Sequence, residues 1–220
     1  MPTGFYFTMD KSWVTEHQRH SKTGRLVVVK RYWRDDRPSL GNGTWESLGL
    51  PPWHKILTVW PPLNVPLWDR HYTYDSLVQF WREYKVLKWH SNSRGVAFQD
   101  RLGDDVTIDD DFMEHLLNRR YANSNDNRWR YMGWLPFVFS RPLEIWRQPV
   151  SKEQKRGRLY LGYFQDKRHG DRPRNFLVTA RVRDGILVAW NATERPHRQI
   201  DAHRHGDFLY HEYFLSTFDE

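Results

Sequence analysis

Two apolar runs, residues 176–182 and 186–190, are joined by the pair Asp184-Gly185. Both members of an Asp-Gly pair tolerate positive φ, so this pair between two β-type runs predicts a tight antiparallel hairpin. A third run at 158–164 is rich in leucine and aromatic residues and predicts a further strand. We therefore expect these segments to form the centre of a sheet.

The N-terminal part of the chain carries two further β-type runs. Residues 4–7 and 25–33 are rich in aromatic and β-branched residues, and turn residues 22–24 precede the second run. From Pro38 to Pro66, glycines and prolines are interspersed with tryptophans, which indicates an ordered but irregular segment. We expect these tryptophans to pack on the core, and a partner-docking surface is the alternative.

The clearest helical pattern extends over residues 74–89. Apolar residues recur there at spacings of three and four, and Asp75 can cap the N-terminus. The polar segment 91–95 interrupts the pattern, and the net charge changes sign there. We expect a boundary at this point between a Trp- and Pro-rich N-terminal region, 1–94, and a nuclease-like α+β domain, 95–220.

Residues 96–118 combine a predicted hairpin with a predicted helix. The first half suits two short strands that turn at Gly103, and the second suits a helix with an acidic first turn, where the macrodipole favours negative charge. The carboxylates at 104–111 lack the alternation and central glycine of a calcium loop, so we interpret them as the start of the helix. His115 lies one turn into this helix, where a structural role and a general acid/base role are both open.

Two prolines organise the segment that follows. Pro136 and Pro142 can each open a helical turn, because proline is favoured at the first helical position. We expect a short apolar helix, followed by a turn that places Ile145 and Trp146 in the core.

Composition excludes several classes of protein. The 220 residues include no cysteine, so there is no disulfide, thiolate metal site or thiol nucleophile. No apolar run approaches the roughly 20 residues of a membrane-spanning helix, and the N-terminus lacks the apolar core of a secretory signal. Mean hydropathy is -0.84. The 12 Trp, 11 Tyr and 12 Phe nevertheless supply the apolar area that a disordered chain lacks, so we expect a folded protein.

Charge is distributed in blocks along the chain. The net charge is +7, and residues 119–198 hold 18 Lys and Arg against 7 Asp and Glu, whereas residues 95–118 hold 1 against 7. The positive block coincides with the predicted hairpin and its flanks, which favours a polyanionic ligand on that face. A solvated, arginine-rich surface is the alternative.

The order of several segments resembles a nuclease family. These segments are FQDRLGDDVTIDDDFMEHLL, RYMGWLPFVFSRPLEIWRQ, RLYLGYF and NFLVTARVRDGILVAWNAT. The series, over residues 96–213, is similar to the phage-associated branch of the barnase/EndoU/colicin/RelE-like nucleases. The resemblance implies an α+β fold with helices packed on a small antiparallel sheet. It also implies a toxin-type endoribonuclease that needs no metal or other cofactor and acts in the cytoplasm of a bacterial host after delivery by a phage.

The family motif falls on a small set of residues here. It corresponds to His115, to an arginine at 128 or 130, to the pair Glu144 and Trp146, and to Thr193. Family members end the hairpin directly in Thr plus an aromatic residue, whereas Trp190-Asn191-Ala192-Thr193 stands here, so the polar terminus is either Asn191 or Thr193. We interpret Glu144 and Trp146 as structural.

The chemistry of RNA cleavage without metal gives these residues roles. The 2'-OH of the substrate is the nucleophile, so the protein supplies a base, an acid and cations for the phosphorane. We expect His115 to be the acid/base, Arg130 and Arg147 to stabilise phosphate charge, and Thr193 to hydrogen-bond a phosphate oxygen. Further cations are expected to bind the nucleic acid: Arg119, Arg120, Arg128, Arg158, Lys167, Arg168 and Arg174.

Four histidines cluster near the C-terminus, at positions 197, 203, 205 and 211. His203 and His205 point to one side of an extended chain, where Asp201 and Asp207 are the only evident further metal ligands. His197 or His203 is also a candidate second proton donor, and exposed loop histidines are the remaining interpretation.

Two other classes of function stay open. An inactive, phage-derived descendant of the fold would bind a host factor or nucleic acid, with residues 1–94 as its working surface. An ADP-ribosyltransferase toxin is less well matched, because the Arg, Ser-Thr-Ser and Glu-x-Glu series is missing. The expected partners are RNA, with tRNA as one candidate, and an immunity or host protein, with no membrane.

Overall fold

The computed structural model describes most of the chain from residue 39 to residue 213. Side chains are described for residues 39–68, 76, 79, 95–109, 111–113, 130–148, 157–168, 170 and 172–213, and the backbone alone for 13–14, 17–20, 26–29, 32–33, 89–92, 128–129 and 169. Statements about what the structure lacks refer to these residues.

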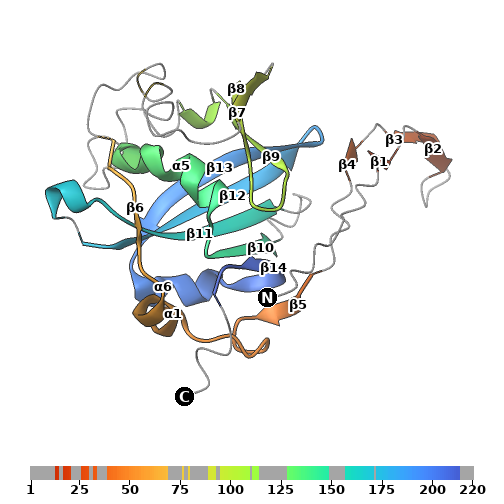
Figure 1. The fold of residues 1–220 in the computed structure, drawn as a ribbon. Helices are drawn as coiled ribbons and strands as arrows, with labels where there is room; N and C mark the ends of the chain where they lie inside the picture. Colours follow the sequence, from red (N-terminus) through yellow and green to blue (C-terminus); the bar gives the residue numbers. More distant parts are fainter. Residues whose placement is uncertain are drawn as a thin grey trace, which may run out of the picture.

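One mixed sheet of ten strands dominates the fold (Figure 1). Nine strands follow the order β5-β14-β10-β11-β12-β13-β9-β8-β7, and β6 pairs with β11 off this path. The strands of this sheet are β5 (Gly41–Thr44), β6 (Leu63–Asn64), β7 (Trp89–Asn92), β8 (Gly95–Gln99), β9 (Asp105–Asp109), β10 (Glu144–Gln148), β11 (Gly157–Gln165), β12 (Arg174–Arg183), β13 (Ile186–Arg195) and β14 (His205–His211).

Short helices join these strands and cover the sheet. The described helices are α1 (Trp53–Val59), α5 (Leu135–Ser140), α6 (His197–Ile200) and the 3-10 helices η1 (Arg128–Trp134), η2 (Lys167–His169) and η3 (Asp201–His203).

The expectation of helices packed on a small antiparallel sheet is wrong. The sheet is large and mixed, because β13 pairs in parallel with β9 and β11 pairs in parallel with β6. It also recruits β5 and β6 from the Gly- and Pro-rich segment, where short strands give no periodic signal. The boundary expected after residue 94 falls between β7 and β8, which pair as an antiparallel hairpin.

The Asp-Gly hairpin is confirmed as the centre of the sheet. Strands β12 and β13 pair from Asn175–Arg195 to Arg183–Ile186, and the two turn residues have φ of 50° at Asp184 and 78° at Gly185. The pairing shifts by one residue between Thr179 and Ala180, which leaves Trp190 as the extra residue of a β-bulge.

Three further local predictions are confirmed. The hairpin of β8 and β9 turns at Gly103, which has a φ of 84°. The backbone N–H of Phe112 donates to the Asp109 carboxylate at 2.9 Å, so the acidic segment caps the start of a helix. Helix α5 carries Pro136 in its first turn. Ile145 and Trp146 are fully buried as predicted, although they lie in strand β10 and not in a turn.

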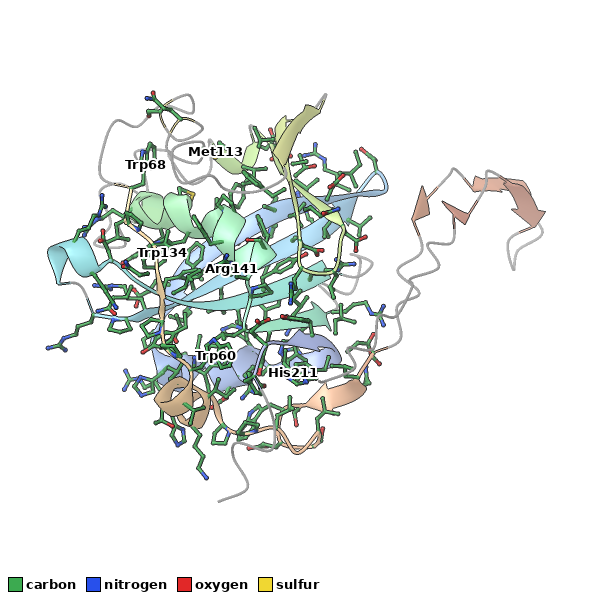
Figure 2. All side chains as sticks on the ribbon, viewed as in Figure 1. Trp60, Trp68, Met113, Trp134, Arg141 and His211 are labelled. Atoms are coloured by element: carbon green, nitrogen blue, oxygen red, sulfur yellow. The ribbon has the colours of Figure 1, made fainter. Side chains whose placement is uncertain are left out.

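The two faces of the sheet have separate cores. On the face that α5 and η1 cover, called the α5 face, the core includes Trp134, Val138, Tyr160 and Phe176. On the face that α1 and α6 cover, called the α1 face, Trp53, Ile56, Leu177 and Ile200 are buried. Figure 1 shows α5 and the pair α1 and α6 on opposite sides of the strands, and Figure 2 labels Trp134 on the first side and Trp60 on the second.

The structure describes part of the two strands predicted in the N-terminal region. The run 25–33 is divided between β3 (Leu26–Val29), which pairs with β2 (His17–His20), and β4 (Tyr32–Trp33), which pairs with β1 (Trp13–Val14). The predicted strand at 4–7 lies outside the described residues.

The other predictions for the N-terminal region concern a helix and the tryptophans. Most of the predicted helix at 74–89 lies outside the described residues; Ser76 and Gln79 are helical, and Trp89 belongs to β7. Trp53 is fully buried in the α1-face core, and Trp45 and Trp60 pack against it, which confirms the expected packing of these tryptophans.

Candidate nucleic-acid interface

Arg147, expected to stabilise phosphate charge, lies on the α5 face. It pairs with Arg158 across β10 and β11. Two positions along β10, Ile145 belongs to the α5-face core, and alternate residues of a strand share one face, so Arg147 lies on that face too. Its Nε donates to the Asp207 carboxylate at 2.6 Å, and its side chain is 11% exposed. The charge of Arg147 is therefore already paired inside the protein.

Arg158 is buried in an ion-pair network that joins β11 to the β8–β9 turn. Its guanidinium lies 2.7 Å from the Asp100 carboxylate and 2.5 Å from that of Asp104. The Tyr160 hydroxyl donates to Asp100 at 2.7 Å, and burial together with the negative charge of Asp100 raises the pKa of Tyr160, which keeps it a donor. These contacts favour a structural role for Arg158.

The other expected cations on this side lie near the η1 and η2 segments. Arg168 pairs with Asp166 at 3.0 Å, and Lys167 is exposed. Arg174 lies 3.4 Å from Glu194 and 5.9 Å from the centroid of the Tyr131 ring. Arg130 lies in η1, where its carbonyl accepts from the backbone N–H of Trp68.

Thr193 lies on the opposite face of the sheet. It pairs with Leu177, which is part of the α1-face core, whereas its neighbour Ala192 belongs to the α5-face core. The structure therefore does not bring Thr193 together with Arg147. His115, Arg119 and Arg120 lie outside the described residues, and only the backbone of Arg128 is described.

A row of polar side chains shares the α1 face with Thr193. Thr179 and Arg181 alternate with Leu177 along β12, and Asn191 and Arg195 alternate with Thr193 along β13. The Arg181 guanidinium lies 3.3 Å from the centroid of the Trp190 ring, which places the bulged tryptophan on this face as well. We call the set the β12–β13 polar face: Thr179, Arg181, Trp190, Asn191, Thr193 and Arg195.

Two members of this face carry buried polar atoms without a hydrogen-bond partner among the described residues. They are Oδ1 of Asn191 and Nε of Arg195. Such atoms cost about 1–3 kcal/mol each when left unsatisfied, so a ligand, an ion or water is expected to contact them. The Thr193 hydroxyl donates to the Glu194 carbonyl at 3.2 Å, and Thr193 is 6% exposed.

His203 is electrostatically coupled to this face. It ends η3, directly after the α6 segment whose Ile200 is buried in the α1-face core. Burial lowers the pKa of His203, and the positive charges of Arg195 and His205 lower it further. His203 is therefore neutral near pH 7 and able to accept a proton. The Gln148 side chain donates to the carbonyls of both His203 and His205, which fixes this segment against β10.

The other clustered histidines have different surroundings. His197 and His205 are exposed. His211 stacks on Phe208 with ring centroids 5.6 Å apart, and its Nδ1 lies 2.6 Å from the Tyr213 carbonyl. Within the part of the chain that the structure describes, no three His, Asp or Glu side chains are grouped so as to hold a metal ion.

Glu144 and Trp146 form part of a buried charged network under the α1-face core. Glu144 and Arg204 are both 0% exposed, and the Arg204 guanidinium lies 2.5 Å from the Glu144 carboxylate. The Trp146 indole donates to Glu144 at 2.7 Å, and the Tyr213 hydroxyl also donates to Glu144. This burial agrees with the structural role that we expected for Glu144 and Trp146.

Sequence reasoning missed Arg181, Trp190, Arg195 and Arg204. The signal for two of them, Arg181 and Arg195, was present in the hairpin itself, since each is an alternate position of its strand, counted from Thr179 and from Thr193. The bulge at Trp190 and the burial of Arg204 leave no comparable signal, because both depend on pairings with distant strands.

A family model for nucleases matches residues 84–211, more than half of the chain and the whole span from β7 to β14. The protein is thus of the nuclease class. It belongs to the phage-Barnase-EndoU-ColicinE5/D-RelE like nuclease2 family, which confirms the resemblance seen in the sequence. No curated protein and no solved structure matches the chain. No helix among the described residues is long and apolar enough to cross a membrane.

Proposed function

We propose that the protein is a metal-independent endoribonuclease that binds RNA along the β12–β13 polar face. The family supplies the nuclease class, and a nuclease acts on nucleic acid. The observation that carries the proposal is a pair of buried polar atoms without a hydrogen-bond partner among the described residues, Oδ1 of Asn191 and Nε of Arg195, on the strand face that also carries Thr193.

The reaction needs a base, an acid and phosphate-binding groups. The base removes the proton of the 2'-OH, the 2'-oxygen forms a bond to phosphorus, and the bond from phosphorus to the 5'-oxygen breaks as the acid protonates that oxygen. The products are a 2',3'-cyclic phosphate and a 5'-hydroxyl. No metal or redox partner enters this balance.

We assign roles according to charge and accessibility. His203 is the base, because its lowered pKa keeps it neutral. Arg195 stabilises the phosphorane, because it makes no ion pair within the described residues. Asn191 or Thr193 contacts a phosphate oxygen. His115 remains the proposed acid. Arg130 and Arg147, on the α5 face, are the alternative phosphate ligands, and the salt dependence of RNA binding distinguishes them from Arg195.

The test is cleavage of labelled RNA, with tRNA as one substrate, by the purified protein in EDTA. We expect products with 2',3'-cyclic phosphate ends, and a loss of at least about 100-fold in His203→Ala, the lower range for a general acid or base. His54→Ala, at an exposed position of α1, is the matched control and should cleave like the parent. If the RNA stays intact but binds tightly, the protein is a nucleic-acid-binding protein and not a nuclease.

A parallel substitution separates the histidines. His115→Ala should also slow cleavage if His115 is the acid, and an unchanged rate would remove it from the mechanism. If His115→Ala abolishes cleavage whereas His203→Ala leaves it unchanged, the base is not on the β12–β13 polar face.

A further inference from the structure

Trp190 differs from the other tryptophans with described side chains in its exposure. It is 46% exposed, although it lies in the middle of a ten-residue strand of the central hairpin. The other exposed large apolar side chains among the described residues are Leu40, Val59 and Val182, none of them aromatic. A single exposed apolar residue needs no explanation by itself, so the surroundings of Trp190 decide its meaning.

The bulge turns Trp190 onto the polar face. Without the extra residue, the alternation of β13 would direct Trp190 away from the face that carries Asn191, its immediate neighbour. With it, both side chains lie on the side where Arg181 stacks. Bulges re-aim single side chains next to functional sites, and this one presents an indole beside the row of polar residues.

Arg181 covers one face of the indole and leaves the remainder open. Its guanidinium carbon lies 3.3 Å from the ring centroid, the separation of direct stacking. Arg181 covers one face of the indole, and 46% of the Trp190 residue is exposed, which leaves part of its surface available to a ligand. The contact fixes the ring, so less side-chain freedom is lost when a ligand stacks on it.

The polar atoms beside the ring fit a nucleobase. Oδ1 of Asn191 is buried and accepts no hydrogen bond from the described residues, so a rotation of this side chain toward Trp190 would offer an unused acceptor to the amino or imino group of a base edge. Arg181 makes no ion pair within the described residues and adds positive charge for the adjoining phosphate. An aromatic ring beside a cation and an amide is the usual means of holding an unpaired base.

We infer that Trp190, Arg181 and Asn191 form a subsite that stacks one unpaired nucleobase of the RNA. The inference rests on the proposed function for its substrate and extends it, because it selects single-stranded RNA over duplex RNA. Bases inside a duplex are stacked on each other and have no face to offer to the indole.

Binding is best measured with a 2'-O-methyl oligoribonucleotide of eight residues, which has no 2'-OH nucleophile, so the parent protein cannot cleave it. Trp190→Ala should weaken binding by about 5- to 150-fold, the range for loss of one base–aromatic stack. Trp190→Phe should retain most of the affinity, because phenylalanine still offers a ring. Leu40→Ala, which removes an exposed apolar side chain on a different segment, is the control and should bind like the parent.

A second measurement identifies the base as the ligand. Removing bases one at a time from the oligonucleotide should find one position that weakens parent binding about as much as Trp190→Ala does, and the same removal should have little effect on the Trp190→Ala protein. A matching duplex should bind more weakly than the single strand and show no dependence on Trp190. If every base removal weakens binding to the parent and to the Trp190→Ala protein by the same factor, no base stacks on Trp190 and the subsite is wrong.

Failure of the subsite and failure of the nuclease give different results. If the parent cleaves RNA, and Trp190→Ala cleaves and binds as well as the parent, the subsite is wrong and the function stands. If the parent cleaves nothing but binds single strands through Trp190, the subsite stands and the nuclease is wrong. Should Trp190→Ala fail to fold, Arg181→Met tests the same stack and should weaken single-strand binding, with unchanged binding overturning the inference.

Discussion

The Nε atom of Arg204 lies 2.9 Å from the Glu144 carboxylate, and neither side chain is exposed to solvent. A buried charge pair of this kind joins β10 to the segment between η3 and β14. Arg204 also contacts Asp201 at 2.8 Å, which in turn accepts from the backbone N–H of Trp53 at the start of α1. The pair thus links the sheet to the helices that cover its α1 face.

Glu144→Gln should strongly destabilise the protein. The substitution keeps the shape of the side chain but leaves Arg204 buried with Asp201 as its remaining counter-charge among the described residues. We therefore expect a loss of about 3 kcal/mol, the lower end for breaking a buried pair. Urea unfolding measures the change. Glu194→Gln, which breaks the partly exposed contact to Arg174, is the control and should cost less than about 1 kcal/mol. Equal effects of the two substitutions would contradict the role of the Glu144–Arg204 pair.

Arg158→Leu should destabilise the protein without a direct effect on RNA. It leaves Asp100 buried without its cation, and we expect a loss of about 3–5 kcal/mol in the free energy of unfolding. Adding Asp100→Asn should recover part of this loss, because the uncompensated charge is then removed. A stable Arg158→Leu protein with weakened RNA binding would instead return Arg158 to the nucleic-acid interface.

The sequence predicted the local hairpins well and the sheet poorly. The Asp184-Gly185 turn, the Gly103 turn and the cap at Asp109 each depend on residues close together in the chain, so their chemistry is legible in the sequence. Strands β5 and β6 have four and two residues, too short for a period, and they join the sheet only through partners more than 90 residues away. The size and mixed character of the sheet follow from those pairings.

The site was predicted unevenly for the same reason. Thr193 is placed on a strand by the hairpin pattern, and residues 191 and 195 share its face by alternation. The face that Arg147 occupies depends on the register between β10 and β11, for which the sequence holds no signal. An arginine-rich block therefore predicts a cationic protein without showing which arginines have carboxylates as neighbours.

The lowered pKa of His203 should be measurable. Burial and the charges of Arg195 and His205 place it below the ordinary value of 6.5, so an NMR titration of labelled histidines should find the pKa of His203 below that value. Arg195→Gln should raise the pKa of His203 only in part, because burial is the largest cause. Arg198→Gln, at an exposed position of α6, is the control and should leave it unchanged.

The same shift sets the direction of a pH effect on stability. The folded pKa lies below the unfolded one, so between the two values the unfolded state binds more protons. The contribution of His203 to stability is therefore present above about pH 6.5 and is lost as the pH falls through that value toward the folded pKa. His203→Gln should flatten the unfolding free energy against pH in this window, and an unchanged curve would contradict the shift.

The salt dependence of RNA binding should distinguish the two faces of the sheet. Each phosphate neutralised on a single strand contributes about 0.7 to the slope of log affinity against log salt concentration. Arg195→Gln should lower the slope by about that amount, because its charge has no carboxylate partner within the described residues and is available to phosphate. Arg147→Gln should change the slope little, because Asp207 lies 2.6 Å from its guanidinium and already compensates the charge.

A 2'-O-methyl oligoribonucleotide serves as the ligand for both, so cleavage does not interfere. If Arg147→Gln lowers the slope and Arg195→Gln does not, the RNA binds on the α5 face, where Arg130 and Arg174 would then be its neighbours.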